Sequence, residues 1–225
     1  MIETENLRKV YPMGSFDVKA LDGVDLAIEK KEFIGIMGPS GSGKTTLLHM
    51  LGILDHPTEG KIRIDGTDIG KLTDYEKTMF RLYKLGYVFQ DYALVPELTV
   101  IENVSLPAML RTDRNEKEYK AASYDILQRV GLCDRRGHLP KELSGGQQQR
   151  VAIARAIVNR PDILFADEPC ANLDTENSRM VLNLFKKINE EMGQTIVMVS
   201  HEEWHKEYFD RIIRMRDGKI ENGGN

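Results

Sequence analysis

An eight-residue segment in the N-terminal part of the chain has the composition needed to bind phosphate. It matches the pattern G-x-x-x-x-G-K-[ST] and follows the apolar stretch Phe33–Met37. Its residues are Gly38, Pro39, Ser40, Gly41, Ser42, Gly43, Lys44 and Thr45, and Thr46 opens the helical stretch that follows. Glycines let consecutive N–H groups point at phosphate oxygens, and the helix N-terminus adds favourable partial charge. Lys44 can reach the β and γ phosphates and the Thr45 hydroxyl can bind Mg²⁺, so this segment predicts a nucleoside triphosphate site.

Two adjacent carboxylates indicate which reaction this site performs, because kinases, GTPases and motor ATPases all share the phosphate loop. Asp167 and Glu168 follow the apolar run Ile163–Ala166, which reads as a strand. Successive strand residues point in opposite directions, so the two carboxylates can take different tasks. Asp167 suits the Mg²⁺ shell, through water, and Glu168 suits a water that attacks the γ-phosphate. An acidic turn at a strand end is the alternative interpretation.

Two more polar residues follow apolar stretches. His201 comes after Thr195–Val199, and Gln90 comes after Tyr87–Phe89. The His201 imidazole can hydrogen-bond the γ-phosphate and hold Glu168 and the water in place. The Gln90 amide can reach metal or water. Each has a plainer interpretation, a surface or packing histidine and a glutamine in a loop contact.

A second anion-binding segment is predicted by Leu143–Gln147. Ser144 can cap a helix, and the Gly145 and Gly146 amides lie open to a phosphate at its positive end, with Gln147 completing the segment. A plain helix cap would also use serine and glycine. Such a cap would not require a phosphate loop about 100 residues upstream.

The elements that position these residues alternate between short apolar runs and amphipathic stretches, which predicts an α/β fold around a largely parallel sheet. Such sheets bind ligands at the C-terminal ends of their strands. The stretches Val18–Ile28 and Lys61–Gly66 predict a small antiparallel sheet beside the core. From about Thr99 to Asn159 the pattern is helical, with interruptions at Pro107, Gly131, Gly137 and Pro140. Near the C-terminus, Asp217-Gly218 predicts a hairpin turn.

Composition narrows the class of protein. The chain has 225 residues and a net charge of −4, which provides no general attraction for nucleic acid. No apolar run approaches the roughly 18 residues that a membrane span needs, and the acidic start Met1–Glu5 does not resemble a signal peptide. A cytoplasmic protein is expected. Cys133 and Cys170 match no metal or disulfide pattern, so both are expected to be free thiols.

The segment Leu143–Gln147, followed by Gln148–Ala156, is identified as the signature sequence of the ATP-binding cassette (ABC) ATPases, and nearly the whole chain resembles that family. The resemblance implies a P-loop NTPase (RecA-like) core with a flanking antiparallel β subdomain and a helical signature subdomain. One domain is expected, with the core and β parts at about 1–90 and 160–225 and the helical part at about 91–159. Other family positions are adenine-stacking Tyr11, the Q-loop Gln90, the D-loop Ala171–Asp174 and the switch histidine His201.

Partners also follow from the resemblance. It implies a head-to-tail homodimer in which each ATP lies between the phosphate loop of one copy and the Ser144–Gln147 segment of the other. The segments Tyr11–Gly14, Leu51–Gly60 and Val88–Thr99 are similar to lipoprotein-release, macrolide-efflux and peptide-export ATPases. Members of that subfamily drive an integral membrane permease, which would place this chain peripherally at the inner face of the cell membrane. A non-transport ABC ATPase that acts on nucleic acid or ribosomes is the alternative function.

The chain departs from the family pattern at three places. Lys30–Glu32 replaces a glycine-glutamate turn, Cys170 replaces threonine or serine, and Ser200–Glu202 replaces Thr-His-Asp. Cys170 lies two residues beyond Glu168, so its alkylation is hypothesised to slow turnover, although a packing role is the plainer interpretation. An aromatic cluster comprising Trp204, His205, Tyr208 and Phe209 is expected to serve packing or a dimer rim.

Overall fold

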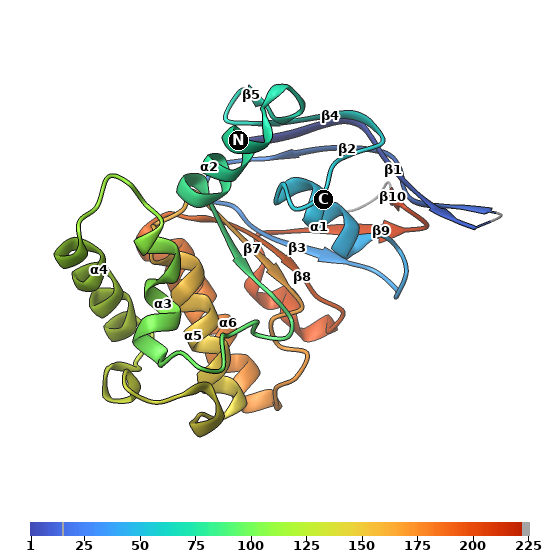
Figure 1. Cartoon of the computed structure of the whole chain (residues 1–225). Coiled ribbons are helices and arrows are strands. Elements are labelled where there is room, and N and C mark those ends of the chain that lie inside the picture. Colours follow the sequence, from blue (N-terminus) through green and yellow to red (C-terminus); the bar gives the residue numbers. More distant parts are fainter. Residues whose placement is uncertain (15, 222–225) are drawn as a thin grey trace.

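The central sheet of the protein is parallel over most of its width. The structure, a computed structural model, describes residues 1–14 and 16–221, and within them the sheet has the order β10-β9-β3-β8-β7-β6 (Figure 1). Its strands are β3 (Phe33–Met37), β6 (Leu85–Val88), β7 (Ile163–Asp167), β8 (Thr195–Val199), β9 (Arg211–Arg216) and β10 (Lys219–Ile220). All neighbouring pairs are parallel except β9 and β10. The predicted α/β core is therefore confirmed.

The strands of this sheet are apolar throughout because both faces are covered. In β7, Ile163 and Phe165 belong to one buried cluster, whereas Leu164 and Ala166 belong to the other. This alternation follows from the two-residue period of a strand. Packing on both faces holds β7 rigidly, and the carboxylates at its end are positioned by that rigidity.

A second, antiparallel sheet lies above the central one in Figure 1, with α1 (Lys44–Leu51) packed between the two. Its strands, in the order β2-β1-β4-β5, are β1 (Ile2–Met13), β2 (Phe16–Ile28), β4 (Glu59–Ile64) and β5 (Thr67–Asp68). The predicted flanking sheet is confirmed for β2 and β4. Sequence reasoning missed β1, which pairs with both of them.

The helical insertion between β6 and β7 is also confirmed. Its helices are α3 (Val100–Met109), α4 (Glu116–Arg129) and α5 (Gly145–Ile157), while α2 (Asp74–Lys84) precedes β6 and α6 (Thr175–Met192) follows β7. The expected interruption at Pro107 is wrong, because α3 runs through this residue and ends two residues later. A proline this close to a helix end breaks few backbone hydrogen bonds. Short 3-10 turns are η1 (Ile69–Lys71), η2 (Cys133–Arg135), η3 (Pro140–Glu142) and η4 (Glu203–Tyr208).

The helical insertion shares its core with the central sheet. Val104 of α3, Leu127 of α4 and Ile153 of α5 lie in the same buried cluster as Leu164 of β7. The division into subdomains at about 90 and 160 stays a prediction.

At the C-terminal hairpin, Asp217 and Gly218 both have positive φ, at 47° and 75°, as the predicted tight turn requires.

Candidate functional site

The phosphate loop leaves β3 in the middle of the sheet and enters α1 at Lys44. Two of its glycines are needed because the backbone passes close to neighbouring strands. A Cβ at Gly38 would lie 2.2 Å from the Met215 carbonyl oxygen, and one at Gly43 would lie 2.4 Å from the Ala20 carbonyl oxygen. Gly41, at φ 77°, has nothing within 4 Å of the corresponding position. The loop is therefore pinned at both ends and open in its middle, as a phosphate cradle must be.

Lys44 crosses back over the loop that precedes it. Its Nζ donates to the carbonyl oxygens of Gly38 and Pro39, both at 3.0 Å. An ammonium group has three donors, so one remains for a phosphate oxygen. The Ser42 hydroxyl is buried and has no hydrogen-bond partner in the described residues. These free donors in an open cradle fit the phosphates of a nucleotide.

Thr45 and Asp167 meet at the base of the loop. The Thr45 hydroxyl donates to Asp167 Oδ1 at 3.1 Å, and His49 Nε2 lies 3.8 Å from Asp167 Oδ2. Burial raises the pKa of the Asp167 carboxyl, while the Thr45 hydroxyl opposes this shift. A cation beside Asp167 would favour its ionised form. Oxygen donors of this kind suit Mg²⁺, whose remaining ligands come from phosphates and water. In residues 1–14 and 16–221 no cluster of three or more His, Cys, Asp or Glu side chains forms a metal site by itself.

Glu168 and His201 meet beside the loop. His201 Nδ1 lies 3.2 Å from Glu168 Oε2, so the two residues that follow β7 and β8 are in contact. The backbone of Glu168 is left-handed, with φ 42°. Its N–H donates to the Val199 carbonyl at 3.2 Å, which holds this strained conformation against β8. Backbone strain of this kind occurs often at functional sites.

One open cavity of about 870 Å³ brings most of these residues together. It is lined by Val18, Lys19, Ala20, Met37, Gly38, Pro39, Ser40, Gly41, Gly43, Lys44, Thr45, Thr46, Glu168, His201, Glu203 and Arg214. Its size is within the range of small-molecule sites, about 300–1,000 Å³. Sequence reasoning missed the contributions of β2, of Glu203 and of Arg214, because no local motif marks them.

Tyr11 is adjacent to this cavity but does not line it. Tyr11 pairs across β1 and β2 with Val18, which does. Its hydroxyl donates to Asp55 Oδ2 at 2.9 Å, and Lys9 Nζ lies 4.8 Å from its ring centroid. Burial and Asp55 raise the pKa of the Tyr11 hydroxyl. Asp55 thus fixes the ring beside the cavity mouth, and sequence reasoning missed this contact.

Gln90 and the Ser144–Gln147 segment lie outside the cavity. The Gln90 carbonyl accepts from Asn172 Nδ2 at 3.4 Å, which links the Q-loop and D-loop positions. Ser144 caps α5 as predicted, because its hydroxyl accepts from the Gln147 N–H at 3.3 Å and its own N–H donates to Gln147 Oε1 at 2.9 Å. No single chain therefore brings the two predicted anion-binding segments together.

Gly146 has a second role that sequence reasoning missed. A Cβ at this position would lie 2.3 Å from Asn177 Oδ1 of α6. Glycine therefore lets α5 begin close to α6 without displacing the Asn177 side chain. The Asn177 amide is itself held by Asp174, the last residue of the predicted D-loop. The signature segment and the D-loop are thereby packed into one unit.

Replacement of Lys44 by alanine is expected to weaken nucleotide binding strongly. It removes the free donor of Nζ and the two hydrogen bonds that shape the loop, and hydrogen bonds to charged groups contribute about 1.5–3 kcal/mol each. Affinity for a fluorescent ATP analogue would be measured by titration. Lys117→Ala, which removes an exposed lysine of α4 outside the cavity, is the matched control. Unchanged affinity in Lys44→Ala would reject the cradle assignment.

Cys170 is expected to be inert in the folded protein. It is 7% exposed, and burial raises the pKa of its thiol to about 12, so it carries almost no thiolate at pH 8. We expect iodoacetamide at pH 8 to label the half-buried Cys133 first, while Cys170 reacts only after unfolding in urea. Peptide mass spectrometry would measure both. Rapid labelling of native Cys170 would revive the hypothesis that its alkylation slows turnover.

A phosphate loop at a strand end, with an aspartate at the loop and a glutamate paired to a histidine, defines a P-loop nucleoside triphosphatase. The family model described as ABC transporter matches residues 21–171. This match includes both the phosphate loop and Ser144–Gln147. The chain belongs to the ABC transporter family and is one of its ATPase cassettes.

Similar proteins agree with this assignment. An uncharacterised ABC transporter ATP-binding protein of Thermotoga maritima is 47% identical over 98% of this chain and 94% of its own length. The lipoprotein-releasing system ATP-binding protein LolD of Aquifex aeolicus is 46% identical over 98% and 96%. The macrolide export ATP-binding/permease protein MacB of Rhodopirellula baltica is 45% identical, but the chain spans only 32% of its length.

The fold is also that of solved cassettes. The ABC transporter cassette MJ0796, solved as a dimer, superposes with a TM-score of 0.91 at 44% identity, over 99% of this chain and 97% of the other. A second structure of MJ0796, in a post-hydrolysis state with ADP and Pi, has the same TM-score at 42% identity. Among residues 1–14 and 16–221, no helix has both the length and the apolar character required to cross a bilayer.

Proposed function

We propose that this chain binds and hydrolyses ATP as one half of a homodimeric motor that drives a separate membrane permease. The observation that carries the proposal is the separation of the two anion-binding segments. The cavity contains the phosphate loop, Glu168 and His201, while Ser144–Gln147 is on another part of the surface. Each cavity is therefore half of a site, and a second copy arranged head to tail supplies the other half.

The phosphate loop positions the substrate. The N–H groups of the loop and the free donor of Lys44 bind the β and γ phosphates, while Tyr11 stacks on the adenine at the mouth of the cavity. Thr45 and, by way of water, Asp167 would hold Mg²⁺, with Gln90 joining them from outside the cavity, and the ion would neutralise charge on the phosphates. The contact between Thr45 and Asp167 prepares their oxygens for that role.

Glu168 acts on the water that attacks the γ-phosphate. Its carboxylate accepts a proton from that water, and the left-handed backbone turns it towards the cavity. His201 Nδ1 holds this carboxylate at 3.2 Å, while Nε2 exchanges its contact with Glu202 for the γ-phosphate when ATP binds. Water attack produces ADP and phosphate, and the loss of the shared γ-phosphate releases the partner's Ser144–Gln147 segment.

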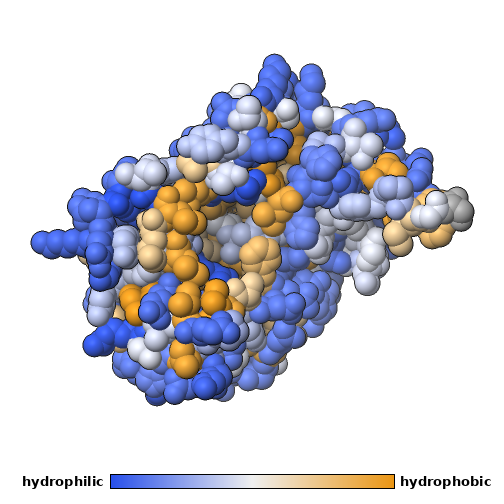
Figure 2. Space-filling model, viewed as in Figure 1, coloured by the Kyte–Doolittle hydropathy of each residue, from blue (hydrophilic) through white to orange (hydrophobic). Residues whose placement is uncertain are grey.

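A groove beside the helical insertion fits the permease. It has a volume of about 320 Å³ and is lined by Arg81, Leu82, Leu85, Gly86, Tyr87, Phe89, Ala93, Pro107, Arg155, Ala156 and Asn159. Figure 2 shows apolar side chains gathered around a hollow on this face, between α2 and α3. The family resemblance implies that the permease docks near Gln90–Leu98 and the helical insertion, and Ala93 of that segment lines the groove. An apolar segment of the permease would fill it.

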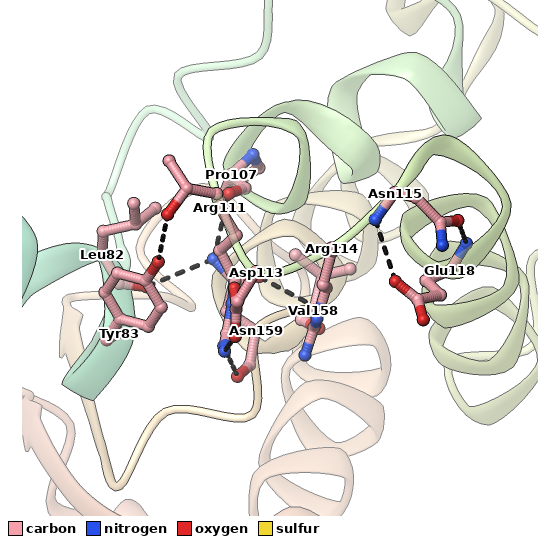
Figure 3. A network of polar contacts seen from close by, with 11 residues as sticks. Leu82, Tyr83, Pro107, Arg111, Asp113, Arg114, Asn115, Glu118, Val158 and Asn159 are labelled. Atoms are coloured by element: carbon pink, nitrogen blue, oxygen red, sulfur yellow. Dashed lines mark hydrogen bonds and ion pairs between the residues drawn. The ribbon is translucent and has the colours of Figure 1, made fainter.

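The groove is built on a polar network that ties three helices together (Figure 3). The Asn159 amide donates to the carbonyls of Leu82 and Pro107 at 3.2 and 3.0 Å. Arg111 donates to the Asn159 carbonyl at 3.4 Å and stacks 4.5 Å from the Tyr83 ring centroid. Satisfied buried networks of this kind rigidify the elements they join. Force on the groove would therefore reach α2, α3 and α5 together.

A second link connects the groove to the signature helix. Arg155 of α5 donates to the carbonyls of Tyr92 and Ala93, at 2.7 and 2.5 Å. Both residues have positive φ, at 59° and 49°, so the segment after Gln90 is strained where this guanidinium binds it. Motion of the segment after Gln90 would thus move α5, whose N-terminus carries Ser144–Gln147.

The kind of permease is proposed from the similar proteins. The relatives described above are named for lipoprotein release and macrolide export, which supports an exporter or a system that transmits motion across the membrane. Docking on such a permease would place the cassette peripherally at the inner face of the cell membrane. These transporter names also favour transport over the alternative of a nucleic-acid or ribosome ATPase.

Co-purification tests the proposal. Tagged Glu168→Gln chain, expressed in its source cells and extracted from membranes with ATP, should bring one integral membrane protein with it. The matched variant adds Phe89→Glu, which places a charge in the groove and away from the cavity. It should retain ATP binding and lose the permease. Recovery of the cassette without any membrane protein, or with nucleic acid, would overturn the transport assignment.

A further inference from the structure

The position of His201 depends on the turn that carries it. Its side chain is 52% exposed, and its two ring nitrogens lie 3.2 Å from Glu168 and 3.3 Å from Glu202. The backbone on either side of His201 must therefore set its distance from Glu168.

That backbone is closed by Ser200, the residue before His201. Ser200 is 3% exposed, and its N–H donates to the Ile36 carbonyl of β3 at 3.1 Å. Its hydroxyl accepts from the Glu202 N–H at 3.2 Å, so the side chain spans His201 and closes a tight turn around it. This turn requires the hydroxyl oxygen to face Glu202.

A buried histidine controls the Ser200 hydroxyl. His205, in η4, is 3% exposed, and its Nδ1 lies 2.7 Å from Ser200 Oγ. Burial lowers the pKa of His205 to about 4, so the ring is neutral at physiological pH and has one N–H. Because Ser200 Oγ already accepts from Glu202, the serine proton is free to point at Nδ1. We assign the imidazole proton to Nε2, the tautomer in which Nδ1 accepts from the serine hydroxyl.

The rest of the His205 ring is held by packing. Trp204 meets the ring edge-on, with centroids 4.3 Å apart at 84°, and the backbone N–H of His205 donates to the Glu202 carbonyl at 3.1 Å. Nε2 is buried without a hydrogen-bond partner in the described residues. A buried donor left unpaired costs about 1–3 kcal/mol, so packing alone would favour an apolar residue here. His205 also lines a cavity of about 140 Å³ together with Glu168 and His201.

We propose that His205 is a positioning residue for hydrolysis, an inference that rests on the proposed ATPase function. Its Nδ1 accepts from Ser200, which directs the hydroxyl oxygen at the Glu202 N–H and locks the turn that holds His201 beside Glu168. The chain from His205 through Ser200 to His201 then sets the geometry of the attacking water. ATP affinity is set by the phosphate loop and does not depend on this chain of contacts.

Four variants test this role through kcat and KM for ATP, with melting temperature measured for each. His205→Val and Ser200→Ala each remove the hydrogen bond, and both should lower kcat about five- to ten-fold with KM unchanged. The double variant should lose no more than either single one. His205→Asn places an amide oxygen near the position of Nδ1 and should recover most of the turnover. His56→Val is the matched control at an exposed histidine, and it should behave as wild type.

Three results would overturn the inference: His205→Val with kcat within two-fold of wild type, additive losses in the double variant, or no recovery in His205→Asn when its melting temperature equals that of wild type. If the proposed ATPase function is wrong, the activity measurements give a different pattern. In that case wild type would hydrolyse no ATP, or Glu168→Gln would retain full turnover. Active wild type with an inactive Glu168→Gln and an unaffected His205→Val rejects only the positioning role.

Discussion

Replacing Glu168 by glutamine is expected to slow ATP hydrolysis about 100- to 10,000-fold while leaving ATP binding intact, because general-base catalysis typically contributes this much. The amide keeps the size of the side chain and can still contact His201, but it cannot accept a proton from water. ATP should then persist between two copies. Size-exclusion chromatography with ATP and Mg²⁺ should show a stable dimer that wild type forms only transiently.

Glu202→Gln is the matched control for this experiment. Glu202 also contacts His201, at 3.3 Å, but it does not line the cavity. The control should hydrolyse ATP at close to the wild-type rate and form no trapped dimer. An unaltered turnover rate in Glu168→Gln would refute the role assigned to this carboxylate.

Replacing Ser144 by arginine should abolish dimerisation driven by ATP. Ser144 is exposed at the N-terminus of α5, in the segment predicted to meet the partner's γ-phosphate. The longer side chain would fill the space that phosphate needs. Tested in the Glu168→Gln background, the variant should elute as a monomer with ATP and should still bind a fluorescent ATP analogue through its own phosphate loop.

The Ser144→Arg variant loses the helix cap and also adds bulk, so a further variant must separate these two effects. Ser144→Ala loses the bond to the Gln147 N–H, which costs about 1 kcal/mol of stability, but it adds no bulk. It should melt at a temperature similar to that of Ser144→Arg and still dimerise at saturating ATP. Normal dimers of Ser144→Arg would contradict the two-copy site.

The parts of the site that sequence reasoning predicted depend on residues adjacent in the chain. The phosphate loop lies between its strand and helix, Glu168 follows its strand directly, and Ser144 caps α5 through Gln147. Local spacing determines such features. The structure places these residues in the predicted strand ends, loop and helix cap, and their chemical roles stay predictions.

The parts that were missed depend on contacts between distant segments. The Asp55 carboxylate holds the Tyr11 hydroxyl from a distant part of the chain. The Asn177 side chain of α6 occupies the space beside Gly146, which accounts for the glycine at that position. Sequence reasoning missed strand β1 because its apolar pattern changes within the strand. A register shift next to Asn6, whose φ is 45°, changes which residues face the core, so the two-residue apolar period breaks in mid-strand.

The left-handed backbone at Glu168 lowers the stability of the folded chain, while the side chain at this position is needed for the proposed hydrolysis. A residue with a side chain costs of order 1 kcal/mol in such a conformation, and glycine would relieve that cost. A library of variants sorted only for heat resistance would therefore enrich chains that have lost this carboxylate. Selection for thermostability alone would not retain this glutamate, so it persists only where turnover itself is selected.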